Sequence, residues 1–546
     1  MKLVLTALLM VLTIAGISAK NVHAAGEVAA WGYNWYGQLG DGTFSGDKPT
    51  PVQVLGLTGV TAVAGGYLHS LALKNDGTVW AWGHNGSGQL GDGTFSGDKP
   101  TPVQVLGLTN VTAIAGRSAH SLALKNDGTI WAWGDNYYGQ LGDGTTETVW
   151  PYGKSTPVQV LGLTGITAVA VGDGHSLALK NDGTVWAWGY NWYGRLGDGT
   201  NNSSNIPVHV LGLTGITAVA VGGGHSLAIK NDGTVWAWGY NCWGQLGDGT
   251  TNSSNIPVQV LGLTGITTVS AGIGHSLALK KDGTVWAWGA NWGGQIGDGT
   301  GGNWDLGNDK SIPVQVLGLT GITAVAGGMA HSLAIKSDGT VWAWGYNGGS
   351  QLGDGTNNTR LTPVQVAGLT EATAVAGGGW HSLAIGHIVP IDTTPPVITI
   401  TNPVAGDYPI SNSIIVGFTV TDEGSGVGAV SANIDGRNVA SGDTIKLYEL
   451  GAGSHTLTVQ ASDIAGNTSS KTVTFNVTVS SASLIELIWL FYNMGLIDNK
   501  GTATSLAQQI QNGAIGAFIN YLDAQTGKNI DPYAADILKS AALTLP

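Results

Sequence analysis

Residues 120–134 read His-Ser-Leu-Ala-Leu-Lys-Asn-Asp-Gly-Thr-Ile-Trp-Ala-Trp-Gly, and this stretch decides the fold because it recurs along the chain. Its first four residue types occur together seven times, beginning at His69, His120, His175, His225, His275, His331 and His381. The Ala-Trp-Gly string at its end also occurs seven times, with its tryptophan at Trp31, Trp82, Trp133, Trp188, Trp238, Trp288 and Trp344. Copies lie about 50 residues apart, a period typical of propellers and repeat arrays.

Each repeat unit predicts four short β-strands. In one unit the segments rich in β-branched, aromatic and small residues are 51–54, 60–64, 70–73 and 78–82. Asp76-Gly77, between the last two, is a hairpin turn signal. Large side chains such as Leu71 and Leu73 alternate with small ones, which suits sheets that are buried on both faces by neighbouring sheets. The sequence therefore predicts a mainly β chain that begins with a seven-bladed β-propeller over residues 26–388.

The two ends of the array predict a closed ring. The chain enters the repeat at the last strand type, residues 28–32, and leaves it after the third strand type, residues 382–385. Seven copies of every strand exist only if the N-terminal strand completes the blade that begins at Pro363. Such pairing closes a propeller and hides its sheet edges.

The units resemble the regulator of chromosome condensation repeat family. The resemblance rests on segments such as 106–116, 120–134 and 136–145, the last of which reads Asn-Tyr-Tyr-Gly-Gln-Leu-Gly-Asp-Gly-Thr. It covers about residues 26–388 and implies a seven-bladed β-propeller. The eukaryotic founder of the family is a chromatin-bound nucleotide exchange factor for a small GTPase, whereas many bacterial members are exported.

Charge and composition argue against several functions. The 546 residues include 22 Lys and Arg against 35 Asp and Glu, a net charge of −13. This balance offers no cationic surface for a phosphate backbone, so nucleic acid is not an expected partner. The exchange function is not carried over, because the sequence begins with the pattern of an export signal and has no basic tail. The single cysteine, Cys242, excludes an intramolecular disulfide and a cysteine-cluster metal site.

The N-terminus predicts export. Lys2 precedes an apolar stretch over residues 3–19, and residues 22–24 (Val-His-Ala) fit the small-x-small pattern of a cleavage site. The stretch is short for a membrane span, and no later segment reaches that length. Residues 1–25 are therefore expected to be a cleaved signal peptide, which would place the mature protein outside the cell or at the cell surface, with no transmembrane segment.

After the repeats the composition changes twice. Residues 389–396 form a Pro-containing linker, and residues 397–480 alternate like a small β-sandwich that resembles the bacterial immunoglobulin-like domains of surface proteins. Residues 481–546 have helical spacing and resemble the small helical module named FIMAH. Four polar residues of the sandwich, Asp422, Glu423, Asp463 and Asn467, are interpreted as turn formers, although their oxygens could also bind Ca²⁺.

Catalytic motifs are absent from the sequence. The seven repeated histidines could form a metal-binding ring, but each stands at a strand start beside small residues, and we interpret it as a buried hydrogen-bond donor between blades. The seven Leu/Ile-Gly-Asp-Gly-Thr strings supply equivalent carboxylates, whereas a glycosidase needs two that differ. Asp beside Gly is typical of turns. We predict no enzymatic activity, no cofactor and no metal.

Variation is concentrated in two loops of each unit and in two longer loops, residues 145–156 and 300–312, which indicates a recognition surface. These loops are rich in Tyr and Trp, which supply rigid contact area for proteins and stacking platforms for sugars. The candidate ligand-binding residues are Trp35, Tyr36, Tyr67, Tyr137, Tyr138, Trp150, Tyr152, Trp192, Tyr193, Trp243, Trp292, Trp304 and Trp380. The alternative is that these aromatic side chains shield blade edges and pack on one another.

The sequence thus predicts an exported, non-enzymatic binding protein whose propeller presents aromatic loops to an extracellular protein or glycan. Two other functions stay open. One is an exported protein inhibitor similar to the propeller-type β-lactamase inhibitor. The other is a carbohydrate-active enzyme with its site in the central funnel.

Overall fold

The computed structural model describes residues 27–302 and 308–545. The predicted signal peptide and the candidate residue Trp304 therefore lie outside the described residues. The chain divides into two compact units, the first ending at Pro390 and the second beginning at Ile391. Within the described ranges, no helix is both long enough and apolar enough to cross a membrane.

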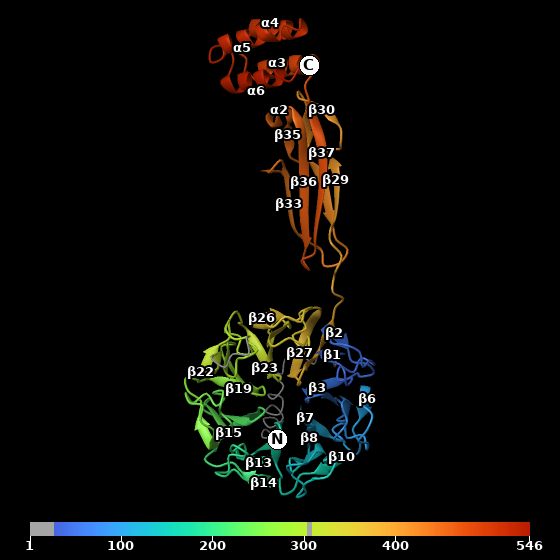
Figure 1. Ribbon diagram of the computed structural model, residues 1–546, viewed down its shortest axis with the longest axis vertical. Coiled ribbons are helices and arrows are strands. Elements are labelled where there is room, and N and C mark those ends of the chain that lie inside the picture. Colours follow the sequence, from blue (N-terminus) through green and yellow to red (C-terminus); the bar gives the residue numbers. More distant parts are fainter. Residues whose placement is uncertain (1–26, 303–307, 546) are drawn as a thin grey trace, which may run out of the picture. The chain divides into compact units, whose positions relative to one another are not determined.

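The first unit contains seven antiparallel sheets of four strands, set around a common axis as the blades of a propeller (Figure 1). Three blades consist of β3 (Val60–Gly65), β4 (His69–Lys74), β5 (Val79–Gly83) and β6 (Lys99–Gln104), then β7 (Val111–Arg117), β8 (His120–Lys125), β9 (Ile130–Asp135) and β10 (Gly153–Gln159), then β11 (Ile166–Val171), β12 (His175–Lys180), β13 (Val185–Gly189) and β14 (Ser204–His209). Three more consist of β15 (Ile216–Val221), β16 (His225–Lys230), β17 (Val235–Gly239) and β18 (Ser254–Gln259), then β19 (Ile266–Ala271), β20 (His275–Lys280), β21 (Val285–Gly289) and β22 (Lys310–Gln315), then β23 (Ile322–Gly327), β24 (His331–Lys336), β25 (Val341–Gly345) and β26 (Arg360–Gln365).

The seventh sheet closes the ring with strands from both ends of the array. Its order is β2-β1-β28-β27, where β1 is Glu27–Gly32, β2 is Lys48–Gln53, β27 is Leu369–Gly377 and β28 is His381–Ile388. Trp31 of β1 lies opposite Ser382 of β28 in an antiparallel register. The predicted pairing of the N-terminal strand with the end of the array is confirmed.

The predicted boundary of a blade is wrong by one strand. Pro363 lies in β26, which pairs with β25 and belongs to the preceding blade. The closing blade instead begins at Leu369 and takes two strands from each end of the array. The reason is that a cyclic repeat has no intrinsic start, so the sequence alone does not show which of four similar strands begins a sheet.

A ring of histidine and serine side chains joins neighbouring blades. His69 Nε2 lies 3.0 Å from Ser121 Oγ of the next blade, and His381 Nε2 lies 2.8 Å from Ser70 Oγ, which completes the circle. The same contact joins His120 to Ser176, His175 to Ser226, His225 to Ser276, His275 to Ser332 and His331 to Ser382. The interpretation of these histidines as buried links between blades is confirmed.

The bonds of the serines fix the role of each histidine. Ser70 Oγ donates to the Gln38 carbonyl oxygen at 2.8 Å, so it accepts a hydrogen bond from the His381 ring, which carries its proton on Nε2. Burial lowers the pKa of the ring histidines, to about 3 for His69, His120, His225, His331 and His381 and well below the usual value for His175 and His275. These side chains are therefore neutral at physiological pH.

The repeated Asp-Gly-Thr strings are turns, as predicted. Asp41 Oδ1 accepts hydrogen bonds from the Thr43 backbone N–H at 3.0 Å and from the Thr43 hydroxyl at 2.7 Å. The Asn34 amide also donates to the same carboxylate at 3.1 Å. Each such aspartate is occupied in holding its own loop.

The second unit combines sheets with helices. Its strands are β29 (Val397–Asn402), β30 (Asp407–Pro409), β31 (Ser413–Ile415), β32 (Gly417–Thr421), β33 (Val427–Ile434), β34 (Arg437–Asn438), β35 (Thr444–Lys446), β36 (Gly453–Asp463) and β37 (Thr468–Thr478). Its helices are α2 (Leu447–Leu450), α3 (Ser481–Asn493), α4 (Lys500–Gln511), α5 (Ile515–Gln525) and α6 (Pro532–Ala542). Phe475 of the sheet and Leu487 of α3 belong to one buried core, so sheets and helices stabilise each other.

Three carboxylates of this unit lie close together. Oxygens of Asp392, Asp422 and Asp463 lie within 4.8 Å of one another, and within the described residues this is the one group of three or more potential metal ligands. Asp463 accepts from the Asn467 N–H at 2.7 Å, and Asp422 accepts from the Gly426 N–H at 2.7 Å. These bonds fit the turn-forming interpretation.

Candidate functional site

Both variable loops of every unit emerge on the same face of the propeller. His69, at the start of β4, pairs with Gly83, at the end of β5, so the loop before the histidine and the loop after Trp-Gly lie at the same end of the blade. The register is repeated in the other blades, for example between His175 and Gly189. We call this end the aromatic face, defined by the described candidate residues together with Tyr33, Tyr190, Tyr240 and Tyr346.

Eight rings on this face form a continuous arc, each in contact with the next. In order they are Tyr152, Tyr137, Tyr138, Tyr190, Trp192, Tyr193, Tyr240 and Trp243. The centroids of Tyr138 and Tyr190 are 4.1 Å apart, and those of Tyr193 and Tyr240 are 4.6 Å apart. The structure thus brings six of the predicted residues, from loops of three successive units, into one surface.

The other candidates lie in shorter groups. Tyr346 contacts both Trp292 and Trp380, and Trp380 Nε1 donates to the Tyr67 hydroxyl at 3.1 Å. Tyr36 contacts Tyr33 and His84. Trp35 and Trp150 are 60% and 70% exposed and contact no other ring of the described chain. These two side chains do not join the arc.

The prediction from the sequence missed the tyrosines that link the arc. Tyr190 and Tyr240 each follow a Trp-Gly pair directly, as do Tyr33 and Tyr346. They lie directly before the Asn of the Asn-x-x-Gly loop, outside the positions from which the candidate residues were predicted. Their signal is visible in the sequence, since four of seven units carry Tyr at this position.

Some candidates also pack, as the alternative interpretation required. Tyr36, Trp243, Trp292 and Trp380 are half-buried. The Trp243 ring lies over Gly274, where a Cβ atom would come within 2.7 Å of Trp243 Cε3. Trp192 and Tyr193, by contrast, are 61% and 43% exposed. The face therefore combines packed rings with accessible ones.

Trp192 and Tyr193 line an open groove of about 680 Å³. The other lining residues are Asn201, Ser253, Ser254, Asn255 and Ile256. None of the seven carries a charge, in contrast with the acidic chain as a whole. We call this feature the 192–193 groove.

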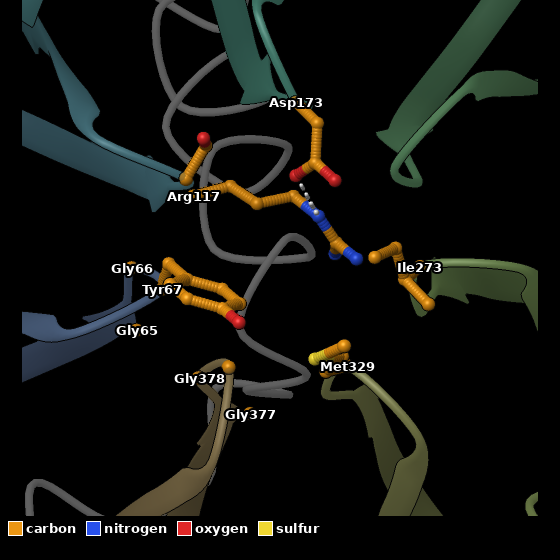
Figure 2. A pocket seen from close by; sticks show the side chains of 11 residues that line it. Gly65, Gly66, Tyr67, Arg117, Asp173, Ile273, Met329, Gly377 and Gly378 are labelled. Atoms are coloured by element: carbon orange, nitrogen blue, oxygen red, sulfur yellow. Dashed lines mark hydrogen bonds and ion pairs between the residues drawn. The ribbon is translucent and has the colours of Figure 1, made fainter.

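A second feature lies at the axis of the propeller, where Figure 2 shows Arg117 extending toward Asp173. Arg117 Nε lies 3.3 Å from Asp173 Oδ1, and Arg117 Nη1 donates to the Ala271 carbonyl oxygen at 3.0 Å. Tyr67 and Met329 also line this cavity, whose volume of about 20 Å³ holds about one water molecule.

The axial cavity does not support the central-funnel enzyme. Its volume is far below the roughly 300 Å³ of small ligand pockets. Asp173 is the one carboxylate among its lining residues and is paired with Arg117, whereas glycoside hydrolysis needs two carboxylates. The signal for Arg117 in the sequence is that the other six copies have Gly at this position.

Burial also affects the polar groups of the arc. It raises the pKa of Tyr190, and a hydrogen bond with Cys242 together with burial raises the pKa of Tyr240 to about 12. These phenols therefore stay neutral and act as hydrogen-bonding groups at the edges of aromatic rings.

A family model described as the RCC1-like domain matches residues 27–384. Among curated relatives, the human E3 ubiquitin-protein ligase HERC2 is 37% identical over 196 residues, which are 34% of this chain and 4% of that protein. The ultraviolet-B receptor UVR8 of Arabidopsis thaliana is 35% identical over 192 residues, which are 34% of this chain and 42% of that protein. The chain thus spans less than half the length of each of these relatives.

Solved structures show the same fold. Yeast RCC1 (Prp20), solved with Kap60 bound, superposes with a TM-score of 0.60 and 24% identity, covering 67% of this chain and 90% of that one. Human WBSCR16 superposes with a TM-score of 0.60 and 26% identity, covering 66% of this chain and 99% of that one. The blade arrangement described above is therefore shared with these proteins.

Proposed function

The chain belongs to the RCC1-like domain family, and we propose that its seven-bladed propeller is a non-enzymatic binding module that presents the aromatic face to a protein or glycan. The observation that carries the proposal is the arc from Tyr152 to Trp243. Tyr and Trp are favoured at binding hot spots because they offer large, rigid contact areas at low entropic cost. A receptor and a Kap60-bound protein among the similar proteins also support a binding role.

The propeller scaffold and the proposed binding surface use different side chains. The buried His-Ser ring and the Asp-Gly-Thr turns use their polar groups within the propeller. The exposed aromatic rings of the arc are not needed for those bonds, so they are free to contact a ligand.

Affinity capture with a variant of the arc tests the proposal. The test variant combines Trp192→Ala with Tyr138→Ala and so removes two rings from the arc. The control is Trp236→Ala, which removes a ring at the opposite end of a blade, where Lys230 Nζ lies 5.1 Å from the ring centroid. We expect the full chain and Trp236→Ala to retain a ligand from extracellular extracts and glycan arrays that the arc variant loses. Equal capture by all three proteins would overturn the proposal.

We further propose that the protein is exported and that residues 397–480 and 481–546 are an immunoglobulin-like domain and a FIMAH-like module at the cell exterior. The support is Lys2 with the apolar stretch 3–19, and the sheet-rich and helical segments of the second unit. Cell fractionation tests export, since a mature protein that still begins at Met1 and stays in the cytoplasm would contradict it.

A further inference from the structure

One loop of the aromatic face has a backbone unlike the others. In six units a Gln follows the Asn-x-x-Gly loop and its side-chain oxygen accepts the N–H of the second variable residue, as in Tyr138 N–H to Gln140 Oε1 at 2.8 Å. The other five bonds join Tyr36 to Gln38, Ser87 to Gln89, Trp243 to Gln245, Gly293 to Gln295 and Gly349 to Gln351. In the remaining unit this position is Arg195, whose guanidinium has no acceptor.

Arg195 reverses the hydrogen bonding of its loop. Its Nε donates to the Trp192 carbonyl oxygen at 3.2 Å, and its Nη1 donates to the Asp173 carbonyl oxygen at 2.9 Å. The guanidinium also stacks on Tyr190, with Cζ 4.5 Å from the ring centroid. The peptide between Trp192 and Tyr193 is therefore turned so that its oxygen, rather than its N–H, faces the residue at position 195.

This reversal places Tyr193 at a φ of 70°, in the left-handed region. None of the six residues at the equivalent position in other units has a positive φ. A bulky side chain in this region is strained, and such strain is retained where the surrounding structure and a function require it. Tyr193, held in this conformation, is exposed and lines the 192–193 groove beside Trp192.

From this geometry we infer that the 192–193 groove binds a neutral glycan, with Trp192 and Tyr193 as the stacking platform. This inference rests on the proposed function and specifies which class of ligand the aromatic face binds. The weakly positive C–H faces of a sugar ring are attracted to the negative face of an aromatic ring. Specificity then needs side chains that both donate and accept hydrogen bonds from hydroxyl groups, which Asn and Ser do.

The other lining residues of the groove include side chains with this chemistry. Asn255 Nδ2 donates to the Gly199 carbonyl oxygen at 2.8 Å, which fixes the side chain and leaves its Oδ1 as an acceptor. The Asn201 side chain is exposed and makes no hydrogen bond with the described residues. Ser253 Oγ accepts from the Asn241 N–H at 3.2 Å and keeps its own proton to donate.

The uncharged lining decides between kinds of ligand. A groove without Lys or Arg offers no partner to uronic acids, sialic acids or phosphates, and a groove without Asp or Glu offers none to basic peptides. Among sugars it therefore fits neutral hexoses and N-acetylhexosamines. The equivalent loop of the next unit does not form a second platform, because Trp243 packs over Gly274.

Calorimetric titration of the full chain with hexasaccharides tests the inference. The probes are neutral hexamers of glucose, mannose and N-acetylglucosamine, with a hexamer of galacturonic acid as the anionic comparison. We expect at least one neutral hexamer to bind and the anionic hexamer not to bind. Trp192→Ala should weaken that binding about tenfold or more, as the loss of one stacking contact does.

Two further variants test the loop at Arg195 and the specificity of the loss. Arg195→Gln should restore the hydrogen bonding of the other six loops and weaken glycan binding without lowering the melting temperature. Trp236→Ala removes a ring at the end of a blade opposite the aromatic face, so it should bind as the unmodified chain does. Glycan binding lost equally in Trp236→Ala, or retained in Trp192→Ala, would overturn the inference.

The outcomes also distinguish this inference from the proposed function. A chain that binds none of the neutral hexamers at millimolar concentration but captures a protein through the arc would refute the glycan ligand and leave the binding module standing. Preferential binding of the galacturonate hexamer would likewise refute it. A chain that captures nothing through the arc would refute both.

Discussion

Replacing one histidine of the buried ring should change how steeply the stability of the propeller depends on pH. His225 is fully buried, its Nε2 lies 2.8 Å from Ser276 Oγ, and burial lowers its pKa to about 3. In the unfolded chain the same group has a pKa of about 6.5. Near pH 5 the unfolded state therefore binds a proton at His225 that the folded state does not.

The sign and the magnitude follow from this difference. Because the unfolded state binds more protons, stability is complete above pH 6.5 and is lost as the pH falls from there toward 3. Each such histidine contributes about 1.4 kcal/mol per pH unit to the slope. All seven ring histidines have lowered pKa values, so together they contribute about 10 kcal/mol per pH unit near pH 5. That is similar to the whole stability of a typical domain.

Urea unfolding of wild type and His225→Gln between pH 5.5 and 7, where the folded state is still populated, measures the effect. The amide of Gln can donate to Ser276 but does not titrate, so the free energy of unfolding should depend on pH less steeply by about 1 kcal/mol per pH unit near pH 6. Aspartates titrate equally in both proteins and cancel. Equal slopes for wild type and His225→Gln would refute the assignment of neutral buried histidines.

Three further changes test the scaffold. Deletion of residues 27–32 removes β1, which lies between β2 and β28 and carries the fully buried Trp31. Calorimetry should therefore show a sharply lower melting temperature, and an unchanged melting temperature would contradict closure of the ring by β1. Trp82→Ala removes a buried ring and its 2.8 Å bond to the Gln38 carbonyl oxygen, and should reduce the free energy of unfolding by about 3–5 kcal/mol in urea titrations, whereas a loss below 1 kcal/mol would mean that the site collapses. Arg117→Leu leaves Asp173 without its ion pair and should destabilise the propeller by about 1–3 kcal/mol, a loss that the double variant with Asp173→Asn should partly restore.

The sequence predicted the strands of each unit well because turns and alternation recur seven times. The segment 60–64 corresponds to β3 (Val60–Gly65) and 70–73 to β4 (His69–Lys74). The sequence did not predict which four strands form one blade. The predicted unit joins segment 51–54 to the strands that follow it, whereas in the structure β2 (Lys48–Gln53) pairs with the preceding strand β1. The repeat period is the same for both groupings, so it does not distinguish them. The helical character of residues 481–546 was also predicted, and α3 to α6 lie within this range, because apolar spacing is a local signal.

Prediction of the candidate site was less complete for a physical reason. Exposure of a loop side chain depends on backbone dihedral angles, and these depend on partners outside the loop. Tyr193 and Trp243 occupy the same position in matching loops, yet Tyr193 is exposed in the left-handed region and Trp243 packs on a glycine. The side chain that bonds to the loop backbone is Arg195 in one loop and Gln245 in the other, a difference that appears conservative as long as both residues are considered only as polar.

The propeller tolerates such a substitution because the scaffold uses the backbone of this position rather than its side chain. The Gln245 carbonyl oxygen accepts from Trp288 Nε1 at 2.9 Å and from Ser276 Oγ at 2.9 Å. The Arg195 carbonyl oxygen does the same with Trp238 Nε1 at 2.8 Å and Ser226 Oγ at 3.1 Å. Since neither bond involves the side chain, that side chain can reshape the loop above it without weakening the ring below. A repeat built in this way can vary its binding surface one unit at a time, and the loop at Arg195 is such a unit.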